Sequence, residues 1–258
     1  NSFSQFQEWD EIKMKTDWDY TDRAHTYDSR ADYNEDAILN LLNSGDLCPG
    51  DKVADIGAGT GKLTKFLLNS GLIVKAVEPN DNMRFYGRKN LQARCLEWIE
   101  GTGEKTRLDN NSVKAVFFGS SFNVVDQMKA LKETKRILFD KGLFSCMWNH
   151  RDTVDFVQSE IENIIKSAIP DYSYGLRRQD PTKVIEESGI FGEVKRIEEP
   201  FWVKMTKENM IKAWESHHTL FRQAGDKFDR IIKDISEFLV KDSYMVPYTT
   251  RIWFGKKR

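Results

Sequence analysis

The stretch V-A-D-I-G-A-G-T-G at residues 53–61 constrains the fold of this chain more than any other. The short apolar run from Lys52 to Ile56 predicts a buried strand. After the glycines, apolar residues recur at Leu63, Phe66 and Leu67, which is the spacing of a helix. The stretch therefore predicts a strand, a glycine turn and a helix. The N-terminus of a helix beside glycines presents free N–H groups to a ligand that approaches closely.

The spacing of these glycines limits the kind of ligand. A dinucleotide fingerprint needs a glycine where Lys62 stands, and a phosphate-binding loop needs Ser or Thr where Leu63 stands. A second apolar run, residues 72–77, ends in Glu78. A carboxylate at the tip of a second strand can accept both hydroxyl protons of a ribose. The sequence therefore predicts a ligand that contains a ribose and need not contain a phosphate.

Residues 53–61, together with A-V-E-P at 76–79 and Met83, resemble the class I S-adenosylmethionine-dependent methyltransferases. They are most similar to the small-molecule branch that includes the ubiquinone/menaquinone methyltransferases. The resemblance implies an α/β fold: a doubly wound, seven-stranded, mainly parallel Rossmann-like sheet with an antiparallel last strand and a helical cover. It also implies a transferase that uses S-adenosylmethionine and releases S-adenosylhomocysteine. The resemblance covers residues 20–155 well and the remainder in outline.

The resemblance also assigns residues to the cofactor. Tyr27 and Arg30 match a segment that borders the methionine end, where a guanidinium suits a carboxylate. Met83 matches a position that packs on adenine. The family usually has Gly-Asp-Ala-Glu at residues 101–104, but Thr102 replaces the acid here, so adenine recognition would rest on the Gly103 backbone and the Thr102 hydroxyl. The predicted cofactor-binding residues are Tyr27, Arg30, Asp55, Gly57, Ala58, Gly59, Glu78, Pro79, Met83, Thr102, Gly103, Glu104, Gly119 and Ser120. No metal ligands are predicted.

The acceptor should lie beyond the carboxyl ends of the strands, as ligands do in open parallel sheets. The predicted strand 113–118 opens there into a loop with Asn123, whose alternative role is to cap a helix. The predicted strand 143–148 ends in W-N-H-R-D at 148–152, which is similar to the same branch. The candidate bases are His150, His217 and His218. Either His217 or its neighbour His218 could face a pocket, but not both. The candidate catalytic residues are Asn123, His217 and Tyr20, with a pocket expected beside Ser120, Asn123 and Trp148.

The chain divides into three predicted parts. Residues 1–36 are rich in aromatics and form an N-terminal lid segment, or alternatively a helix pair packed on the sheet. Residues 37–203 with 244–258 form the cofactor-binding core, whose last two strands are predicted at 192–202 and 248–256. Residues 204–243 are too many for a turn between these strands and predict a helical insertion over the substrate.

Composition and charge limit the kinds of partner and the cellular location that we expect for this chain. The net charge of −1 and the lack of a basic stripe argue against nucleic acid. No apolar run approaches the roughly 20 residues that span a bilayer, so no membrane span is expected. The cysteines at 48, 95 and 146 form no disulfide framework, which favours a cytoplasmic protein. The oligomeric state is left open by the sequence.

The sequence favours methyl transfer to the O, N or C atom of a small molecule, by in-line displacement in an enclosed pocket. Such a reaction depends mainly on the alignment of donor and acceptor and on the exclusion of water. Two alternatives stay open. The same fold and cofactor could serve a lyase or cyclase that acts on S-adenosylmethionine itself, or a methyltransferase of tRNA or protein.

Overall fold

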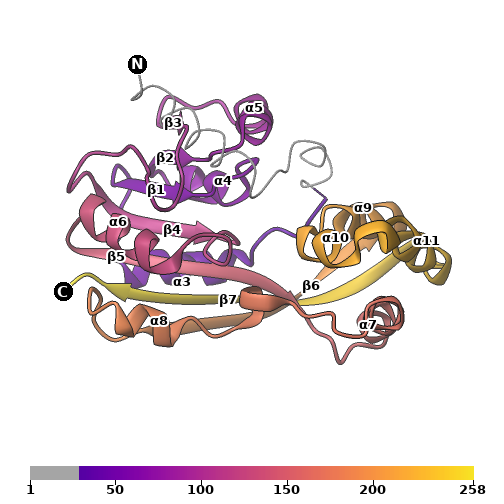
Figure 1. Ribbon diagram of the computed structural model, residues 1–258. Helices are drawn as coiled ribbons and strands as arrows, with labels where there is room; N and C mark the ends of the chain where they lie inside the picture. Colours follow the sequence, from indigo (N-terminus) through magenta and orange to yellow (C-terminus); the bar gives the residue numbers. More distant parts are fainter. Residues whose placement is uncertain (1–28) are drawn as a thin grey trace, which may run out of the picture.

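A seven-stranded sheet in the order β3-β2-β1-β4-β5-β7-β6 forms the centre of the molecule (Figure 1). The structure is a computed structural model and describes residues 29–258. Strands β1 to β5 run parallel, and β7 is antiparallel to both β5 and β6. The predicted fold class is therefore confirmed. The strands are β1 (Lys52–Ile56), β2 (Ile73–Val77), β3 (Leu96–Ile99), β4 (Val113–Gly119), β5 (Leu138–Arg151), β6 (Lys195–Thr206) and β7 (Ser243–Lys256).

Helices cover both faces of this sheet, because the side chains of a strand alternate between faces. On one face, Val53 and Phe117 pack with Leu63 and Leu41 of the helices α4 and α3. On the other face, buried residues of α6 and α8 complete a second core. The helices are α3 (Glu35–Ser44), α4 (Lys62–Asn69), α5 (Asp81–Asn90), α6 (Gln127–Ile137), α7 (Phe156–Ala168), α8 (Thr182–Glu187), α9 (Lys207–Glu215), α10 (His218–Ala224) and α11 (Phe228–Phe238), with 3-10 turns η2 (Gly175–Arg178) and η3 (Gly225–Lys227).

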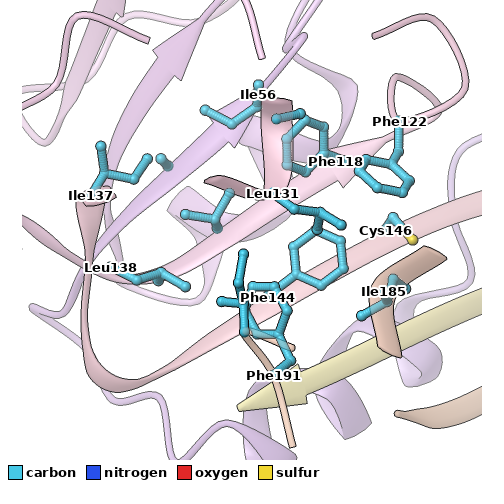
Figure 2. Close-up of a cluster of buried hydrophobic side chains, with 14 of the residues drawn as sticks. Ile56, Phe118, Phe122, Leu131, Ile137, Leu138, Phe144, Cys146, Ile185 and Phe191 are labelled. Atoms are coloured by element: carbon cyan, nitrogen blue, oxygen red, sulfur yellow. The ribbon is translucent and has the colours of Figure 1, made fainter. Parts of the chain in front are cut away.

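A group of phenylalanines anchors the end of β4 and the loop that follows it (Figure 2). The rings of Phe118 and Phe122 lie 5.3 Å apart, and Phe144 contacts Phe122 at 5.5 Å and Phe191 at 4.9 Å. All four are fully buried. Burying a side chain of this size stabilises the fold by about 1.5–3 kcal/mol. The packing of these rings therefore fixes the position of the backbone where the loop after β4 begins.

Strands β5, β6 and β7 are longer than the sequence predicts. β6 pairs with β7 over its whole length and continues beyond the end of β5, whose last residue, Arg151, lies opposite Tyr248. The sequence predicts this strand at 192–202, interrupted or ended by Pro200, yet β6 passes through this proline and runs on to Thr206. β6 is an edge strand, where proline is tolerated because alternate backbone N–H groups face away from the sheet. Its alternating, mostly exposed side chains gave no continuous apolar signal.

The projecting β6–β7 ribbon supports a third hydrophobic core. Helices α9 to α11 connect β6 to β7 and pack with α7, next to the end of the sheet toward which β4 and β5 point (Figure 1). Their buried residues include Trp214 on α9, Ile231 on α11 and Ile165 on α7. The connecting segment was predicted at 204–243, whereas its helices occupy 207–238. A cluster of helices therefore lies at the carboxyl edge of the sheet.

Candidate functional site

The turn after β1 depends on glycines. Gly57, Gly59 and Gly61 have φ angles of 70°, 58° and 94°, the left-handed region that glycine adopts without a steric penalty. A Cβ atom on Gly57 would lie 2.5 Å from the Cβ of Ser121. Gly61 is the N-cap of α4 and has no side chain, so no capping side chain occupies the N-terminal end of this helix. The turn thus brings the backbone close to the edge of the sheet, where the N–H groups of Gly57 and Ala58 both donate to the Val77 carbonyl.

Asp55, the buried carboxylate of β1, has an incomplete set of partners. Its Oδ2 accepts a hydrogen bond of 2.6 Å from the Thr64 hydroxyl. Its Oδ1 is buried and has no partner among residues 29–258. Burial, with a smaller effect from the charge of Glu78, raises the pKa of Asp55 from 3.8 to about 7. A buried acceptor without a partner suits a ligand that brings an N–H donor or a positive charge.

Glu78 stands at the carboxyl end of β2, directly beside the glycine turn. Its Oε2 accepts from the Gly59 N–H at 2.9 Å, and its Oε1 accepts from the Asn80 N–H at 2.9 Å. Burial raises its pKa, and these hydrogen bonds oppose the shift. Each oxygen retains a second lone pair for a ligand hydroxyl. Asn80 also caps α5 by accepting from the N–H of Met83, which is buried.

The loop after β3 is tied to α6 rather than open. Glu104 accepts from the Asp126 N–H at 2.7 Å, and the Thr102 hydroxyl accepts from the Lys105 N–H at 3.2 Å. A Cβ atom on Gly103 would lie 2.8 Å from Val125. The polar side chains assigned to adenine thus already have protein partners. An adenine contact through the Gly103 backbone stays a prediction.

A cavity lies at the carboxyl edge, next to the glycine turn. It is lined by Arg30, Ala31, Tyr33, Asp55, Gly57, Ala58, Lys62, Leu63, Gly119, Ser120, Asn149, Arg151, Arg177, His217 and Tyr248. The lining therefore comes from the first described residues, the ends of β1, β4 and β5, the turn η2, the helical segment after β6, and β7. Segments that are far apart in the sequence meet here.

The cavity brings together only part of the predicted site. The predicted residues that line it are Arg30, Asp55, Gly57, Ala58, Gly119, Ser120 and His217. Gly59, Glu78, Pro79, Met83, Thr102, Gly103, Glu104 and Asn123 are not among its lining residues. Tyr20 and Tyr27 lie outside the described residues. The lining residues that the sequence did not assign to the site are Ala31, Tyr33, Lys62, Leu63, Asn149, Arg151, Arg177 and Tyr248. For Asn149 and Arg151 a signal existed, because both belong to the motif at the end of a predicted strand.

Ser120 holds the loop after β4 in an unusual conformation. Its φ of 58° is left-handed, which is uncommon outside glycine, and such strain often occurs at functional sites. Its N–H donates to the Met147 carbonyl at 2.8 Å, and its hydroxyl lies 2.8 Å from the hydroxyl of Tyr33. Tyr33 thus connects the segment before α3 to the end of β4.

Asn123 does not face the cavity. Its Oδ1 accepts a hydrogen bond of 2.8 Å from the indole N–H of Trp148. Trp148 is 1% exposed and packs edge-on against Trp253. Of the three residues expected beside the pocket, Ser120 lines the cavity, whereas the half-buried Asn123 and the buried Trp148 are not among its lining residues. A pocket beside Asn123 and Trp148 stays a prediction. Asp126, and not Asn123, caps the following helix.

His217 lines the cavity as a neutral residue. It caps α10, and its Nδ1 accepts from the Leu220 N–H at 3.3 Å. Burial, with the charges of Arg177 and Arg151, holds the pKa of His217 well below its usual 6.5. Because the lone pair of Nδ1 is used, the proton of the neutral ring lies on Nε2. His217 therefore presents a hydrogen-bond donor to the cavity, which does not fit the role of a general base.

His150, another candidate base, is a structural residue. Its Nδ1 accepts from the guanidinium of Arg251 at 3.0 Å, so its Nε2–H donates to the Arg177 carbonyl at 2.9 Å. Burial lowers its pKa to about 3. Both ring nitrogens are thus occupied within the protein, and His150 fixes the backbone of η2 beside β5.

Arg30 joins the first described residues to the corner between α9 and α10. Its Nε donates to the Ser216 hydroxyl at 2.9 Å, and its Nη2 donates to the Ser216 carbonyl. Its own carbonyl accepts from Lys62 at 2.7 Å, and Lys62 also pairs with Asp32 at 2.8 Å. An ion pair of Arg30 with a ligand carboxylate stays a prediction. The contact observed is with the helical segment.

Two negative findings apply to the described part of the chain, residues 29–258. No group of three or more His, Cys, Asp or Glu side chains is arranged to hold a metal ion. No helix there has the length and the apolar character that a membrane crossing requires.

Comparison with known proteins agrees with this geometry. Residues 54–146 match a family model described as a methyltransferase domain. An uncharacterised methyltransferase of Mycobacterium tuberculosis (strain ATCC 25618 / H37Rv) is 41% identical over 123 residues, which cover 48% of this chain and 48% of that protein. The match thus spans about half the length of this curated relative.

Solved structures share the fold over most of the chain. A protein from Anaeromyxobacter dehalogenans, provisionally described as a Type II methyltransferase, aligns with 88% of this chain and 97% of its own at 16% identity, with a TM-score of 0.60. The phosphoethanolamine N-methyltransferase 2 of Haemonchus contortus, solved with phosphomonomethylethanolamine and S-adenosylhomocysteine, aligns with 86% of this chain and 52% of its own at 16% identity, with a TM-score of 0.50.

The sheet order, the glycine turn and the buried acid that follows it define a Rossmann-like methyltransferase fold. The methyltransferase domain matched at residues 54–146 and the mycobacterial relative show that this chain is similar to the class I S-adenosylmethionine-dependent methyltransferases.

Proposed function

We propose that this chain transfers a methyl group from S-adenosylmethionine to the O, N or C atom of a small molecule held in the cavity at the carboxyl edge. The observation that supports this most is the pair of buried acids on either side of the glycine turn. Asp55 lies in the cavity wall with an oxygen that has no partner among residues 29–258, and Glu78 follows the last residue of the neighbouring strand. The relative solved with S-adenosylhomocysteine supports the same cofactor.

The residues present fit this cofactor. The Oδ1 of Asp55 can accept from the ammonium group, and the free lone pairs of Glu78 can accept from the ribose hydroxyls. Gly57 leaves the space that a side chain would fill. Met83 and Thr102-Gly103-Glu104 remain the proposed adenine side, and Tyr27 and Arg30 the proposed methionine side. The bound cofactor would supply the electrophilic methyl group.

The protein's own contribution is alignment and enclosure. Helices α9 to α11 are proposed as the substrate cover, since His217, between α9 and α10, lines the cavity together with Tyr248 of β7. Enclosure removes water and strengthens electrostatic contacts with the reacting groups. Alignment in such a site can lower the barrier by about 7–11 kcal/mol. An enclosed site would favour a metabolite over a polynucleotide, and the three free cysteines support the cytoplasmic location expected from the sequence.

Calorimetry with S-adenosylhomocysteine tests the cofactor assignment. Glu78→Gln should weaken its affinity, because hydrogen bonds to a charged group contribute about 1.5–3 kcal/mol each, which is roughly 10- to 150-fold. Glu97→Gln is a matched control, since Glu97 lies on β3 with its side chain 58% exposed. Melting curves check that both variants fold. If Glu78→Gln binds as well as wild type, the ribose assignment is lost.

A second measurement tests the reaction. Purified protein is incubated with S-adenosylmethionine that carries an isotopically labelled methyl group and with a small-metabolite extract. Mass spectrometry should then find a metabolite that has gained the labelled methyl. Cofactor fragments without a methylated metabolite would instead indicate the lyase or cyclase alternative.

A further inference from the structure

The cavity has a basic side that the proposed reaction does not yet explain. Arg151, the last residue of β5, is half-buried there, and its guanidinium carbon lies 4.3 Å from the ring centroid of Trp214 and 5.7 Å from that of Tyr248. A guanidinium that stacks on aromatic rings keeps its N–H groups at the edge, where they can form a fork with a planar anion. The structure thus fixes the orientation of this cation on the cavity wall.

Arg151 has no counter-ion in the described chain. No carboxylate of residues 29–258 lies within 4.0 Å of its guanidinium nitrogens, whereas Lys62 pairs with Asp32 and Arg251 pairs with Glu198. Within residues 29–258, the contacts of the Arg151 guanidinium are with the two aromatic rings. Partial burial of a charge without an opposite charge is costly. A bound anion would offset this cost.

The surroundings of Arg151 are also basic. Arg177 lines the same cavity, and the guanidinium of Arg178 donates to the Arg151 carbonyl at 3.0 Å. The pKa of His217 is lowered by the charges of four arginines: Arg177, Arg151, Arg30 and Arg178. The only carboxylate among the described lining residues is Asp55, which belongs to the glycine turn side. The positive charges therefore converge on one part of the cavity.

His217 adds a neutral donor to these cations. Its Nδ1 is occupied by the Leu220 N–H, and its Nε2–H forms no hydrogen bond with any residue from 29 to 258. Its ring packs against Trp214, the same ring on which Arg151 lies. Donors from α9–α10 and β5 thus face one space, and only an acceptor such as an oxyanion complements them.

We propose that the methyl acceptor of this site carries a carboxylate or a phosphate group, which binds the guanidinium of Arg151 with the Nε2–H of His217 and Arg177 as further donors. This inference rests on the proposed function and specifies its substrate class. The anion would hold the acceptor in place, and its negative charge would lie opposite the cationic cofactor across the cavity.

The test uses the full chain saturated with S-adenosylhomocysteine. Inorganic phosphate and succinate are titrated separately, at constant ionic strength, and binding is followed by calorimetry. Wild type should bind one or both, and Arg151→Gln should lose roughly tenfold or more in affinity, the effect of removing a charged hydrogen bond. Arg151→Lys should recover part of the loss, because it keeps the charge without the fork. The two titrations tell a phosphate site from a carboxylate site.

Controls separate this inference from the cofactor assignment. Arg230→Gln changes an arginine on α11 whose side chain is 85% exposed, and it should bind both anions as wild type does. The affinity for S-adenosylhomocysteine should stay close to wild type in every variant, which also shows that each has folded. Equal anion binding by wild type and Arg151→Gln, or no anion binding by wild type, would overturn the inference. Failure to bind S-adenosylhomocysteine in wild type would overturn the proposed function instead.

Discussion

The two sides of the cavity differ in charge and in origin. The acidic side consists of Asp55 in the cavity wall, with Glu78 beyond the lining on the other side of the glycine turn, and it is built by one strand-turn-helix unit with the next strand. The basic side consists of Arg151, Arg177 and the donor His217, and it is assembled from β5, η2 and the helices after β6. An acidic side suits a cationic cofactor, and a basic side suits an anionic acceptor. The comparison suggests that cofactor binding and acceptor choice can be altered separately.

The largest effect is expected on the acidic side. Gly57→Ala forces a left-handed alanine and places its Cβ 2.5 Å from that of Ser121. The strain alone costs about 1–3 kcal/mol. Because the turn must shift, affinity for S-adenosylhomocysteine should fall about 100-fold or more.

Gly189→Ala is the matched control for this change. Gly189 has a φ of 65°, and no atom lies within 4 Å of an added Cβ. This variant should lose stability through backbone strain but keep its cofactor affinity. Calorimetry and melting curves measure both quantities. Equal cofactor affinities in the two variants would show that the turn does not approach the cofactor.

The next effect concerns the pH dependence of the acidic side. The folded-state pKa of Asp55, about 7, is above its ordinary 3.8. The stabilisation from a neutral Asp55 is therefore complete below about pH 4 and is lost as the pH rises toward 7. Relative to Asp55→Asn, wild type should lose up to about 4 kcal/mol over this range. Urea unfolding of both proteins between pH 4 and 8 measures the difference, and parallel curves would contradict it.

The same group should couple cofactor binding to protons. A cationic ammonium favours the ionised form of Asp55, so binding below pH 7 should release a proton. Affinity for S-adenosylhomocysteine should rise by at most about tenfold per pH unit from 5.5 to 7 and then level off. In Asp55→Asn this rise should disappear. Calorimetry in two buffers with different ionisation enthalpies counts the protons, and no release at pH 6 would contradict the expectation.

A smaller effect tests the basic side. His217→Asn keeps the helix cap, because asparagine is a good N-cap, but it shortens the donor. Turnover should fall roughly tenfold, the effect of one lost hydrogen bond. The pH profile should not change shape between pH 6 and 8, since His217 is neutral throughout this range. If wild type shows an acidic limb near pH 6.5 that disappears in this variant, His217 is a base after all.

The two sides also differ in how far the sequence predicts them. The acidic side follows from local patterns: the glycines require left-handed φ angles, and Glu78 ends the next strand. The basic side depends on the long pairing of β5 with β7, which places Arg151 opposite Tyr248. Periodicity alone predicted shorter strands, so this contact was not expected. The residues that form the basic side are brought together only by tertiary structure.

Asn123 shows a second limit of the sequence. Its place in the loop after β4 was predicted correctly, but the direction of its side chain was not. The indole N–H of Trp148 is buried and needs an acceptor, and the Oδ1 of Asn123 supplies it. Such a pairing between two segments leaves no periodic signal. The fold class, the glycine turn and the buried acid were therefore predictable, and the acceptor side was not.

The smallest expected effect concerns the link between the two sides. Arg30 lines the cavity near the glycine turn, and its guanidinium donates to Ser216 at the corner of α9 and α10. Ser216→Ala removes the hydroxyl but keeps the carbonyl that Arg30 also contacts, so it should cost about 0.5–1.5 kcal/mol of stability. The melting temperature measures this loss. Ser167→Ala is the control, because its exposed hydroxyl bonds only within its own helix, to the Asn163 carbonyl.

Hydrogen exchange shows whether this link also transmits binding. In wild type, S-adenosylhomocysteine should slow exchange in residues 29–33 and in 207–224 together, because both segments line the cavity and Arg30 joins them. In Ser216→Ala the slowing should persist in 29–33 and weaken in 207–224. Equal slowing of both segments in the variant would mean that the remaining carbonyl contact or packing holds the cover, and that the two sides of the cavity close as one unit.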